Sequence, residues 1–385
     1  MCELLGISCN KKVGASFSFK HLASHSKKNP HGWGLAFYPD ESVQIFKEPE
    51  RADESQLAKF IPKYDRVCSN IFISHIRLWK AETMAYKNSH PFSREWSGRS
   101  YVFAHNGKVP NLPKSSVSQG CFHPIGITDS EKVFCNLMGF ISLENLDFLD
   151  EADLSLMEEH LRHINHGRNV RLNCLLSDGN RLLCYRDLHC HKNLFLLQRG
   201  AGAIPEGHHY EDEELSIQLH IKKGRDERAC IVATEPLTSE SWTDLAPGTL
   251  TVLEKGEIVY PSPMDFEDPN VIYAEVYDSP SWAEGWQGFP NVVGMPEKLR
   301  KRLGVELRER VSLEFGGKSV VLSVCPSDKR LTNIALGSVA DNRESHVWLP
   351  PRKREELGLK VTGTCEGKHS FKKKYGCVAI QIPQN

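Results

Sequence analysis

Short apolar runs separated by turn-forming residues dominate the first two thirds of the chain. The segment 31–49 predicts two strands joined by a Pro-Asp turn, and 170–187 predicts a hairpin that turns at Asp-Gly-Asn. Further strand-like runs are 69–79, 100–109, 228–237 and 248–259. This pattern is typical of a domain built largely from antiparallel strands.

Two segments of the same region carry apolar residues at helical spacing instead. The segment 128–143 opens on Thr-Asp, which favours a helix cap, and its apolar residues recur three or four positions apart. Those residues are Val133, Leu137, Phe140 and Ile141. The segment 153–164 shows similar spacing. We therefore predict an α+β domain over residues 1–260.

A proline-rich stretch follows this domain. Residues 261–294 contain five prolines among acidic and aromatic residues, and proline disfavours regular structure. The aromatic residues of the stretch are Tyr273, Tyr277, Trp282, Trp286 and Phe289. A flexible tether would not need so many. We expect a connector that packs onto the first domain.

The last segment, 295–385, contains an internal repeat with a period of 54 residues. The run MPEKLRKRLGV at 295–305 aligns with LPPRKREELGL at 349–359. Each copy has a proline near its start and ends in Leu-Gly and one apolar residue, which favours a short helix capped at both ends. Because strand-like runs follow each copy, the repeat predicts a small pseudo-symmetric β-barrel.

Length and composition suit two soluble modules. The chain has 385 residues, 40% of them hydrophobic, and no apolar run reaches the roughly 18 to 20 residues of a membrane-spanning helix. The net charge is −9 in residues 1–294 and +8 in 295–385, so we expect the modules to have different partners. The start lacks a basic stretch followed by an apolar one, which favours a cytoplasmic protein.

Cysteine usage favours free thiols over a disulfide scaffold. The twelve cysteines are scattered and none form CxxC, so we expect most of them to be reduced and buried. The run LHCHKN, with His189, Cys190 and His191, could suggest a metal site. No second ligand pair lies at a suitable spacing, so a surface cluster is the better interpretation. We expect neither a metal nor a cofactor.

Four features converge on Cys2. The first is its position behind Met1, whose removal is expected because the next residue is small; it would leave a thiol and a free α-amine on Cys2. The ordinary pKa values of these groups, about 8.5 and about 8, allow the amine to take the thiol proton near neutral pH. A nucleophile formed in this way needs no histidine base.

Polar residues at strand ends and at a helix start supply the other three features. Asn106 and Gly107 end a strand run and offer a side-chain amide and a backbone N–H, the donors that an oxyanion hole requires. Arg77 ends another run, and its planar guanidinium suits a carboxylate. Asp129 lies at a helix start and can hold an ammonium group. Together they predict a pocket for a free α-amino acid.

Each of these residues also has a structural interpretation. Arg77 can form a salt bridge at a strand end, and Asp129 can cap its helix. His75, His90 and His105 lie near the motifs, and we interpret them as scaffold because a terminal amine makes a histidine base unnecessary.

Eight short motifs occur in one order along residues 1–260. They are MCELLGIS, HGWGLAFY, SHIR, NSHPF, FAHNGKV, TDSEKVF, LSDG and ATEPLT. In this order the chain resembles the class II glutamine amidotransferases of the N-terminal nucleophile hydrolase superfamily, and among them the stand-alone YafJ type. The resemblance implies a four-layer αββα sandwich.

The resemblance also implies a role for each candidate residue. Cys2 would attack the γ-amide of glutamine, with its own α-amine as proton acceptor and later donor. Asn106 and Gly107 would bind the oxyanion. Arg77 would bind the substrate α-carboxylate and Asp129 its α-ammonium. Water would then resolve the γ-glutamyl thioester.

One position departs from the family's pattern. Lys80 stands where many members have a threonine that helps to bind the glutamine carboxylate. Hydrolysis of γ-glutamyl peptides is therefore an alternative to glutamine hydrolysis. The chain has no nucleotide-binding loop of the GxxxxGK[ST] kind, so we expect the acceptor of ammonia or of the γ-glutamyl group to be a separate enzyme.

The repeat module resembles, more weakly, the swapped-hairpin barrels of AbrB-like transcription factors, and double-psi barrels share its pattern. Its candidate residues for binding nucleic acid or a protein partner are Arg300, Lys301, Arg302, Arg352, Lys353 and Arg354. A solvated basic surface and a docking site for an acidic partner are the alternatives. A non-catalytic regulator bound to nucleic acid is accordingly a second class of function.

Overall fold

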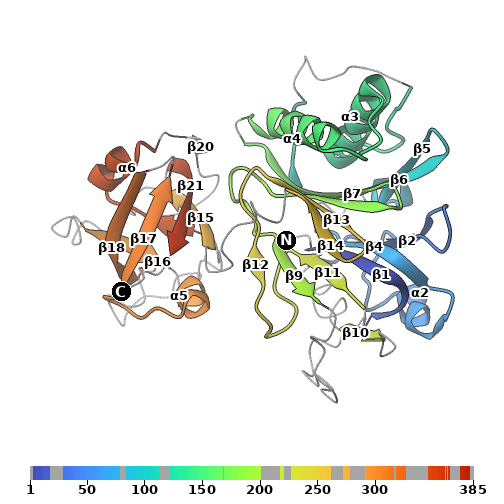
Figure 1. The fold of residues 1–385 in the computed structure, drawn as a ribbon, viewed down its shortest axis with the longest axis horizontal. Coiled ribbons are helices and arrows are strands. Elements are labelled where there is room, and N and C mark those ends of the chain that lie inside the picture. Colours follow the sequence, from blue (N-terminus) through green and yellow to red (C-terminus); the bar gives the residue numbers. More distant parts are fainter. Residues whose placement is uncertain are drawn as a thin grey trace. The chain divides into compact units, whose positions relative to one another are not determined.

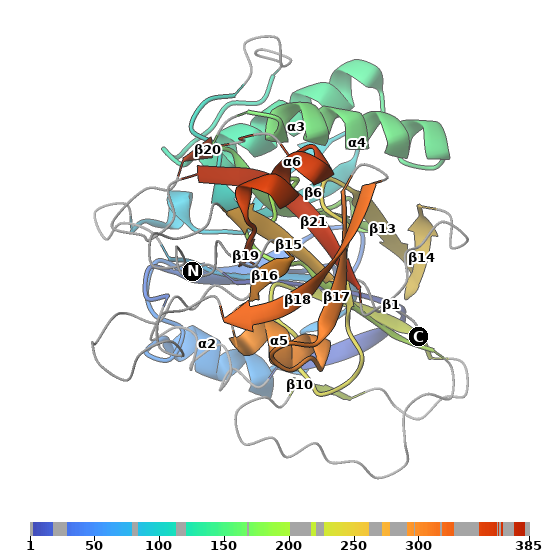
Figure 2. The same cartoon turned by 90° about the vertical axis from the view of Figure 1, so that its left-hand side faces the viewer.

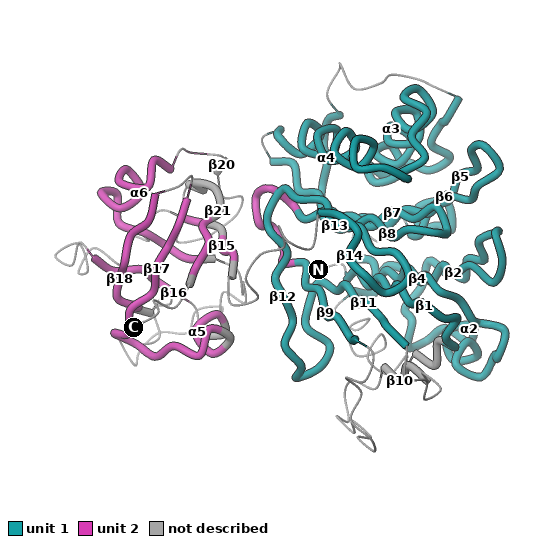
Figure 3. Tube along the Cα trace, viewed as in Figure 1, with its two compact units in different colours: residues 1–186, 194–266 teal, residues 187–193, 267–385 magenta. Residues whose placement is uncertain are grey.

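The computed structural model describes the chain in segments. They are residues 3–17, 29–78, 84–112, 121–167, 169–200, 217–220, 227–261, 272–277, 291–295, 297–315, 318–326, 346–359, 361, 363–364 and 373–381. The chain divides into two compact units, which Figure 3 draws in different colours. The first unit contains residues 1–186 and 194–266, and the second contains 187–193 and 267–385.

One antiparallel sheet of the first unit contains the start of the chain. Its strands lie in the order β12-β9-β11-β1-β4-β2-β3, and β10 pairs with another part of β1. The bounds are β1 Glu3–Phe17, β2 Trp33–Phe37, β3 Gln44–Glu48, β4 Cys68–Ile76, β9 Phe195–Arg199, β10 Ile217–His220, β11 Ala229–Ala233 and β12 Thr243–Asp244. Strand β1 therefore lies between β4 and β11, in the middle of the sheet.

A second antiparallel sheet packs face to face against the first. Its strands lie in the order β14-β13-β8-β7-β6-β5. The bounds are β5 Phe92–Trp96, β6 Arg99–Lys108, β7 Arg171–Ser177, β8 Arg181–Tyr185, β13 Leu250–Glu254 and β14 Glu257–Tyr260. A buried apolar cluster fills the space between the sheets, with Leu4 and Ile73 from one sheet and Val102 and Leu175 from the other.

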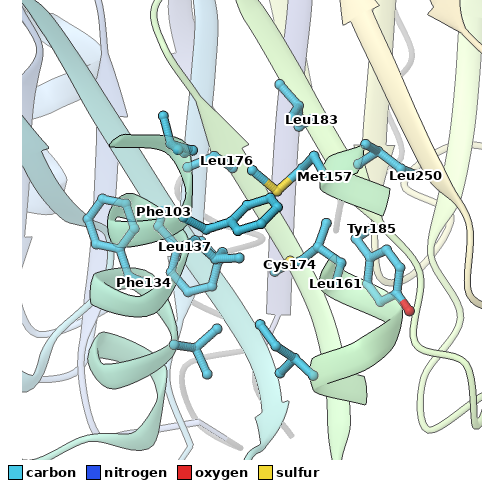
Figure 4. Packing of buried hydrophobic residues seen from close by; sticks show 14 of the residues in the cluster. Phe103, Phe134, Leu137, Met157, Leu161, Cys174, Leu176, Leu183, Tyr185 and Leu250 are labelled. Atoms are coloured by element: carbon cyan, nitrogen blue, oxygen red, sulfur yellow. The ribbon is translucent and has the colours of Figure 1, made fainter. Parts of the chain in front are cut away.

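Helices cover the outer faces of both sheets (Figure 1). Helices α3 Asp129–Glu144 and α4 Glu151–Asn165 lie on the second sheet, where Phe134 and Leu137 pack against Phe103 (Figure 4). On the far side of the first sheet, α2 Gln56–Phe60 and the 3-10 turn η1 Ile61–Lys63 contribute to another apolar cluster. A short turn, η3, spans Tyr86–Asn88. The αββα layering is therefore confirmed.

Alternation along β6 explains how one strand serves two layers. Tyr101 and Phe103 belong to the cluster under the helices, whereas Val102 and Ala104 belong to the cluster between the sheets. Continued along the strand, the same alternation places His105 on the helix side and Asn106 on the side of the first sheet.

The second unit is a barrel-like sheet with its own core. The strands follow the order β15-β19-β16-β18-β17-β21-β20, and β15 also pairs with β21, so the sheet closes on itself. The bounds are β15 Ile272–Tyr277, β16 Val292–Met295, α5 Glu297–Leu303, β17 Arg310–Phe315, β18 Lys318–Pro326, β19 His346–Trp348, α6 Pro351–Leu357, β20 Gly363–Thr364 and β21 Lys373–Gln381. Apolar residues of these strands and of both helices fill the interior.

The period of 54 residues reappears in the barrel. Helices α5 and α6 begin and end 54 residues apart, and both are followed by glycines with positive φ. The N–H groups of Val305 and Leu359, also 54 apart, bond to the carbonyls of Arg300 and Arg354 at 3.0 and 2.9 Å. The two helices lie at opposite ends of the barrel in both views (Figure 1 and Figure 2). The predicted barrel built from a repeat is thus confirmed.

The stretch 261–294 differs from the expected connector without regular structure. Its residues 272–277 form β15 and its residues 292–294 belong to β16, and both strands lie in the barrel sheet. The reason is local, because the run IYAEVY lacks proline and consists mostly of β-branched and aromatic residues. Residues 262–271 and 278–290 lie outside the described part of the chain.

Candidate active site

The candidate site surrounds the first described residues of β1. Cys2 lies outside the described residues, and Glu3 directly follows it. Glu3 pairs with Ile76 of β4, and Leu4 pairs with His75. The register therefore carries the candidate residue Arg77, which follows Ile76, toward the end of the chain that bears Cys2.

Thr234, which follows β11, binds this end of β1 on the side opposite β4. Its hydroxyl donates to Glu3 Oε2 at 2.7 Å and accepts from the Leu4 N–H at 3.2 Å. The Thr234 N–H also bonds to the Leu4 carbonyl at 3.2 Å. Thr234 belongs to the ATEPLT motif, whose local pattern does not indicate a role for it. The structure shows that it holds the residues next to Cys2.

Arg77 is almost completely buried, with 3% of its surface exposed. Its backbone N–H donates to the Gly32 carbonyl at 2.8 Å, and its carbonyl accepts from the His31 N–H at 3.1 Å. Its Nη1 donates to the His31 carbonyl at 3.3 Å. The loop that precedes β2 thus fixes the arginine at the end of β4. A planar guanidinium with five N–H donors is suited to bind a carboxylate.

Asn106 and Gly107 occupy the end of β6, where they pair with Asn173 and Leu172 of β7. Asn106 is buried. Strand β6 packs against β1 and β4 across the space between the sheets. The two residues predicted to bind the oxyanion therefore lie on a strand that packs against β1.

Asp129 is the first residue of α3 and is half-buried. Its Oδ2 accepts from the Val109 N–H at 2.7 Å, and its Oδ1 accepts from the Ser130 N–H at 3.0 Å. A carboxylate has about four lone-pair sites, so Asp129 retains acceptors for an ammonium group. The helix cap itself is Thr128, whose hydroxyl accepts from the Glu131 N–H. Thr128, and not Asp129, therefore caps the helix.

Glu131 and Asn88, neither of which was predicted as a functional residue, organise the loop that leads into Asp129. Glu131 accepts from the N–H groups of Ile125 and Gly126 at 3.0 and 2.7 Å and from Arg94 Nη2 at 2.7 Å. Asn88 Oδ1 accepts from the Ile127 N–H at 3.0 Å. The Thr-x-x-Glu spacing of a capping box was the available signal.

The histidines near the motifs are buried between the layers. The rings of His75 and His90 lie 4.1 Å apart, and the His90 ring contacts the edge of Phe92. Burial, with further contributions from the nearby His105 and from the Arg77 guanidinium, lowers the pKa of His75 to about 3. Burial likewise holds the pKa of His90 well below its ordinary value. Both rings are therefore neutral near pH 7.

Buried cysteines elsewhere in the first unit are unsuited to nucleophilic chemistry. Burial raises the pKa values of Cys9 and Cys230 to about 12, and it raises those of Cys174 and Cys184 as well. Because the thiolate is the reactive form, these four residues do not compete with Cys2 as nucleophiles.

The run around Cys190 is not the surface cluster that we expected. Cys190 is 1% exposed and disulfide-bonded, and the N–H groups of His189 and His191 both donate to Asp187 Oδ2. Within the described residues, no group of three or more His, Cys, Asp or Glu side chains could hold a metal ion.

The basic residues of the barrel helices have different surroundings. Arg300 and Arg354 are mostly buried, and Arg354 Nη1 donates to the Leu349 carbonyl at 2.8 Å. Lys301 and Arg352 are exposed, while Lys353 pairs with Glu356 at 2.7 Å. The side chain of Arg302 lies outside the described part. Binding of nucleic acid or of a partner by this set stays a prediction.

Among the described residues, no helix combines the length and apolar character needed to cross a bilayer.

Comparison with known proteins gives consistent matches. The family model for class II glutamine amidotransferases matches residues 1–272. "Uncharacterized protein MJ1515" of Methanocaldococcus jannaschii is 39% identical over 261 residues, which are 68% of this chain and 71% of that protein. "Putative glutamine amidotransferase YafJ" of Escherichia coli is 34% identical over 271 residues, 67% of this chain and 100% of that protein.

A solved structure matches a similar share of the chain. The crystal structure of a "predicted glutamine amidotransferase" from Pseudomonas aeruginosa is 26% identical in sequence. The match covers 67% of this chain and 99% of that one, with a TM-score of 0.49.

Proposed function

This chain belongs to the class II glutamine amidotransferases, and we propose that it releases ammonia from the γ-amide of glutamine through a thioester on Cys2. One observation carries the proposal. Arg77 follows the residue of β4 that pairs with Glu3, the strand β6 that carries Asn106 and Gly107 packs against β1, and Asp129 binds Val109, which directly follows β6.

The reaction would proceed in two halves. The α-amine of Cys2 takes the thiol proton, and the sulfur attacks the amide carbon of the substrate. Asn106 Nδ2 and the Gly107 N–H donate to the oxygen of the tetrahedral intermediate. The C–N bond then breaks, and the ammonium of Cys2 returns its proton to the departing ammonia. Water attacks the thioester by the same route and releases glutamate and the free thiol.

Substrate recognition would use opposite charges at two ends of the amino acid. Arg77, held by the His31 carbonyl, would donate to the α-carboxylate. Asp129, held by the Val109 N–H, would accept from the α-ammonium. The ammonia or the γ-glutamyl group would pass to an acceptor bound by another protein.

A glutaminase assay of the purified protein tests this proposal. Asn106→Ala should lower kcat by about 10²–10³-fold because one oxyanion donor is lost, while the protein remains folded. Absence of glutamate release by the wild-type protein, or full turnover by Asn106→Ala, would contradict the proposal.

Lys80 motivates a second candidate substrate class. It replaces the threonine that many family members have, and it lies outside the described residues. γ-Glutamyl peptides therefore belong in the same assay. Turnover of the peptides without turnover of glutamine would favour this alternative.

The second unit has two exposed basic residues, Lys301 and Arg352, which support the proposal that it binds nucleic acid. A gel shift of the full chain at low and high salt tests it, because binding through phosphates weakens steeply with salt. A lack of shift at low salt would end the idea.

A further inference from the structure

His105 joins the oxyanion strand to the first turn of α3. Its Nε2 lies 2.9 Å from the Arg171 carbonyl oxygen, and its Nδ1 lies 2.9 Å from Ser130 Oγ. A carbonyl only accepts, so Nε2 must carry the proton of the neutral ring. Nδ1 of that ring accepts, and the Ser130 hydroxyl donates to it. His105 and Ser130 are both buried, which shields this bond from water.

A second bond runs in parallel to the first. The Val109 N–H donates to Asp129 Oδ2 at 2.7 Å, and the Ser130 N–H donates to Asp129 Oδ1 at 3.0 Å. Two consecutive residues of α3, Asp129 and Ser130, are thus bound to Val109 and His105. His105 in β6 and Val109, which directly follows β6, lie on either side of Asn106 and Gly107 in sequence.

The same backbone carbonyl, that of Arg171, lies beside both the His105 ring and Gly107. A Cβ atom at residue 107 would lie 2.7 Å from His105 Nε2 and 1.9 Å from the Arg171 carbonyl oxygen. The carbonyl that fixes the ring is therefore the same group that requires a bare backbone at Gly107. A movement of the ring would disturb the Asp129 side and the Gly107 side together.

The docking of α3 as a whole does not depend on this link. Phe134 stacks on Phe103 at 5.3 Å, and Val133, Leu137, Met138 and Ile141 are buried in the same cluster (Figure 4). Loss of the Ser130 hydroxyl should therefore leave the helix in place and release mainly its first residues.

We propose that His105 and Ser130 are positioning residues that set the Asp129 carboxylate at a fixed place relative to Asn106 and Gly107, and so make the enzyme select substrates with a free α-ammonium group. This inference rests on the proposed function. The link would fix the distance between the ammonium site and the oxyanion site, and the substrate spans that distance.

The test compares two substrates that differ in one group. Glutamine carries the α-ammonium, whereas glutaramate, the same amide acid without the α-amino group, does not. For Ser130→Ala we expect kcat/KM for glutamine to fall about tenfold, mainly through KM, and kcat/KM for glutaramate to change less than about twofold. Asp129→Asn should lower kcat/KM for glutamine more than Ser130→Ala does, again with little change for glutaramate. This variant shows how large the effect is when the ammonium site itself is altered.

His105 variants supply an independent arm. His105→Asn retains an amide oxygen near the position of Nδ1 and should keep more of the preference for glutamine than His105→Ala does. Thermal unfolding of each variant separates a positioning defect from a folding defect, because a folding defect lowers turnover of both substrates alike.

The outcomes are distinct. An active wild type whose Ser130→Ala variant loses equal activity on both substrates, together with no difference between the His105 variants, overturns this inference alone. A wild type that turns over neither glutamine nor glutaramate overturns the proposed function and this inference with it.

Discussion

At Gly107 the neighbouring strand comes too close for a side chain. The Arg171 carbonyl oxygen would lie 1.9 Å from a Cβ atom, and the φ of 156° falls in the region that favours glycine. Only glycine, which has no Cβ atom, fits this close approach of the two strands. The same residue type serves both the strand pairing and the proposed oxyanion hole.

Gly107→Ala should damage both stability and activity. We expect the free energy of unfolding to fall by about 2–3 kcal/mol, because backbone must shift to admit the methyl group. We expect kcat to fall by at least about 10²-fold, because the oxyanion donor moves. Urea denaturation and the glutaminase assay measure the two effects.

Gly14→Ala is the matched control, since a Cβ atom there meets nothing within 4 Å. It should change stability by less than about 1 kcal/mol and leave activity intact. Full activity of Gly107→Ala would argue against the assigned oxyanion donor.

Burial of His75 gives the protein a dependence on pH. Its pKa is about 3 in the folded protein, mainly because of burial, against an ordinary value of about 6.5 in the unfolded chain. Between these values the unfolded chain binds a proton that the folded protein does not, so stability falls as pH falls from about 6.5 toward 3. The loss can reach about 1.4 kcal/mol per pH unit for this residue.

His75→Asn should reduce the slope of the unfolding free energy against pH. The reduction corresponds to the uptake of at most one proton on unfolding. Urea denaturation at pH 7, 6 and 5 measures it. An unchanged slope in the variant would show that other groups dominate acid sensitivity.

At the scale of elements, the start of α3 depends on a side chain that is not its cap. Glu131 sits where a capping box would place it, but it binds the upstream loop at Ile125 and Gly126 and also Arg94. The carboxylate is nearly fully buried, so its charge is balanced by the guanidinium and by two N–H groups. These contacts hold the loop that precedes Asp129 in one conformation.

Glu131→Gln should destabilise the protein by about 3 kcal/mol, because Arg94 loses its charged partner in a mostly buried place. KM for glutamine should rise as the loop before Asp129 loosens. Glu144→Gln, at the exposed end of the same helix, is the control and should change stability by less than about 0.5 kcal/mol. Equal effects of the two substitutions would contradict the role of Glu131.

Local patterns were sufficient for much of this architecture. Apolar spacing and the Thr-Asp start predicted α3, and the Asp-Gly-Asn turn predicted the hairpin of β7 and β8. Strand-end positions also pointed to Arg77, Asn106 and Gly107. The role of Thr234 could not be predicted from the sequence, because its partners Glu3 and Leu4 lie about 230 residues away along the chain. Such partnerships depend on which strands become neighbours, and strand order cannot be read from apolar spacing.

At the scale of the whole molecule, each unit has a separate hydrophobic core. The clusters of the first unit and the cluster of the barrel share no residues. The barrel was foreseen from its 54-residue repeat, but residues 187–193, which also belong to the second unit, were not. They follow β8 directly in the sequence, so nothing in the local pattern separates them from the first unit.

Gly294→Ala should affect the barrel alone. A Cβ atom there would lie 1.9 Å from Trp348 Nε1, at the residue where β16 pairs with β19. We expect calorimetry to show one unfolding transition lowered and another unchanged, with glutaminase activity retained. Gly304→Ala, whose Cβ atom meets nothing within 4 Å, should cost only about 1 kcal/mol from its positive φ. A uniform loss in every transition would contradict separate cores.

In the proposed mechanism the α-amine and the thiol of Cys2 act together. Intact-mass analysis of the protein, before and after treatment with an electrophilic diazoketone analogue of glutamine, is the sharpest test of this pairing. We expect a mass lacking Met1 and one added label that disappears in Cys2→Ala. A protein that keeps Met1 yet cleaves glutamine at full rate, or a label that persists in Cys2→Ala, would contradict it.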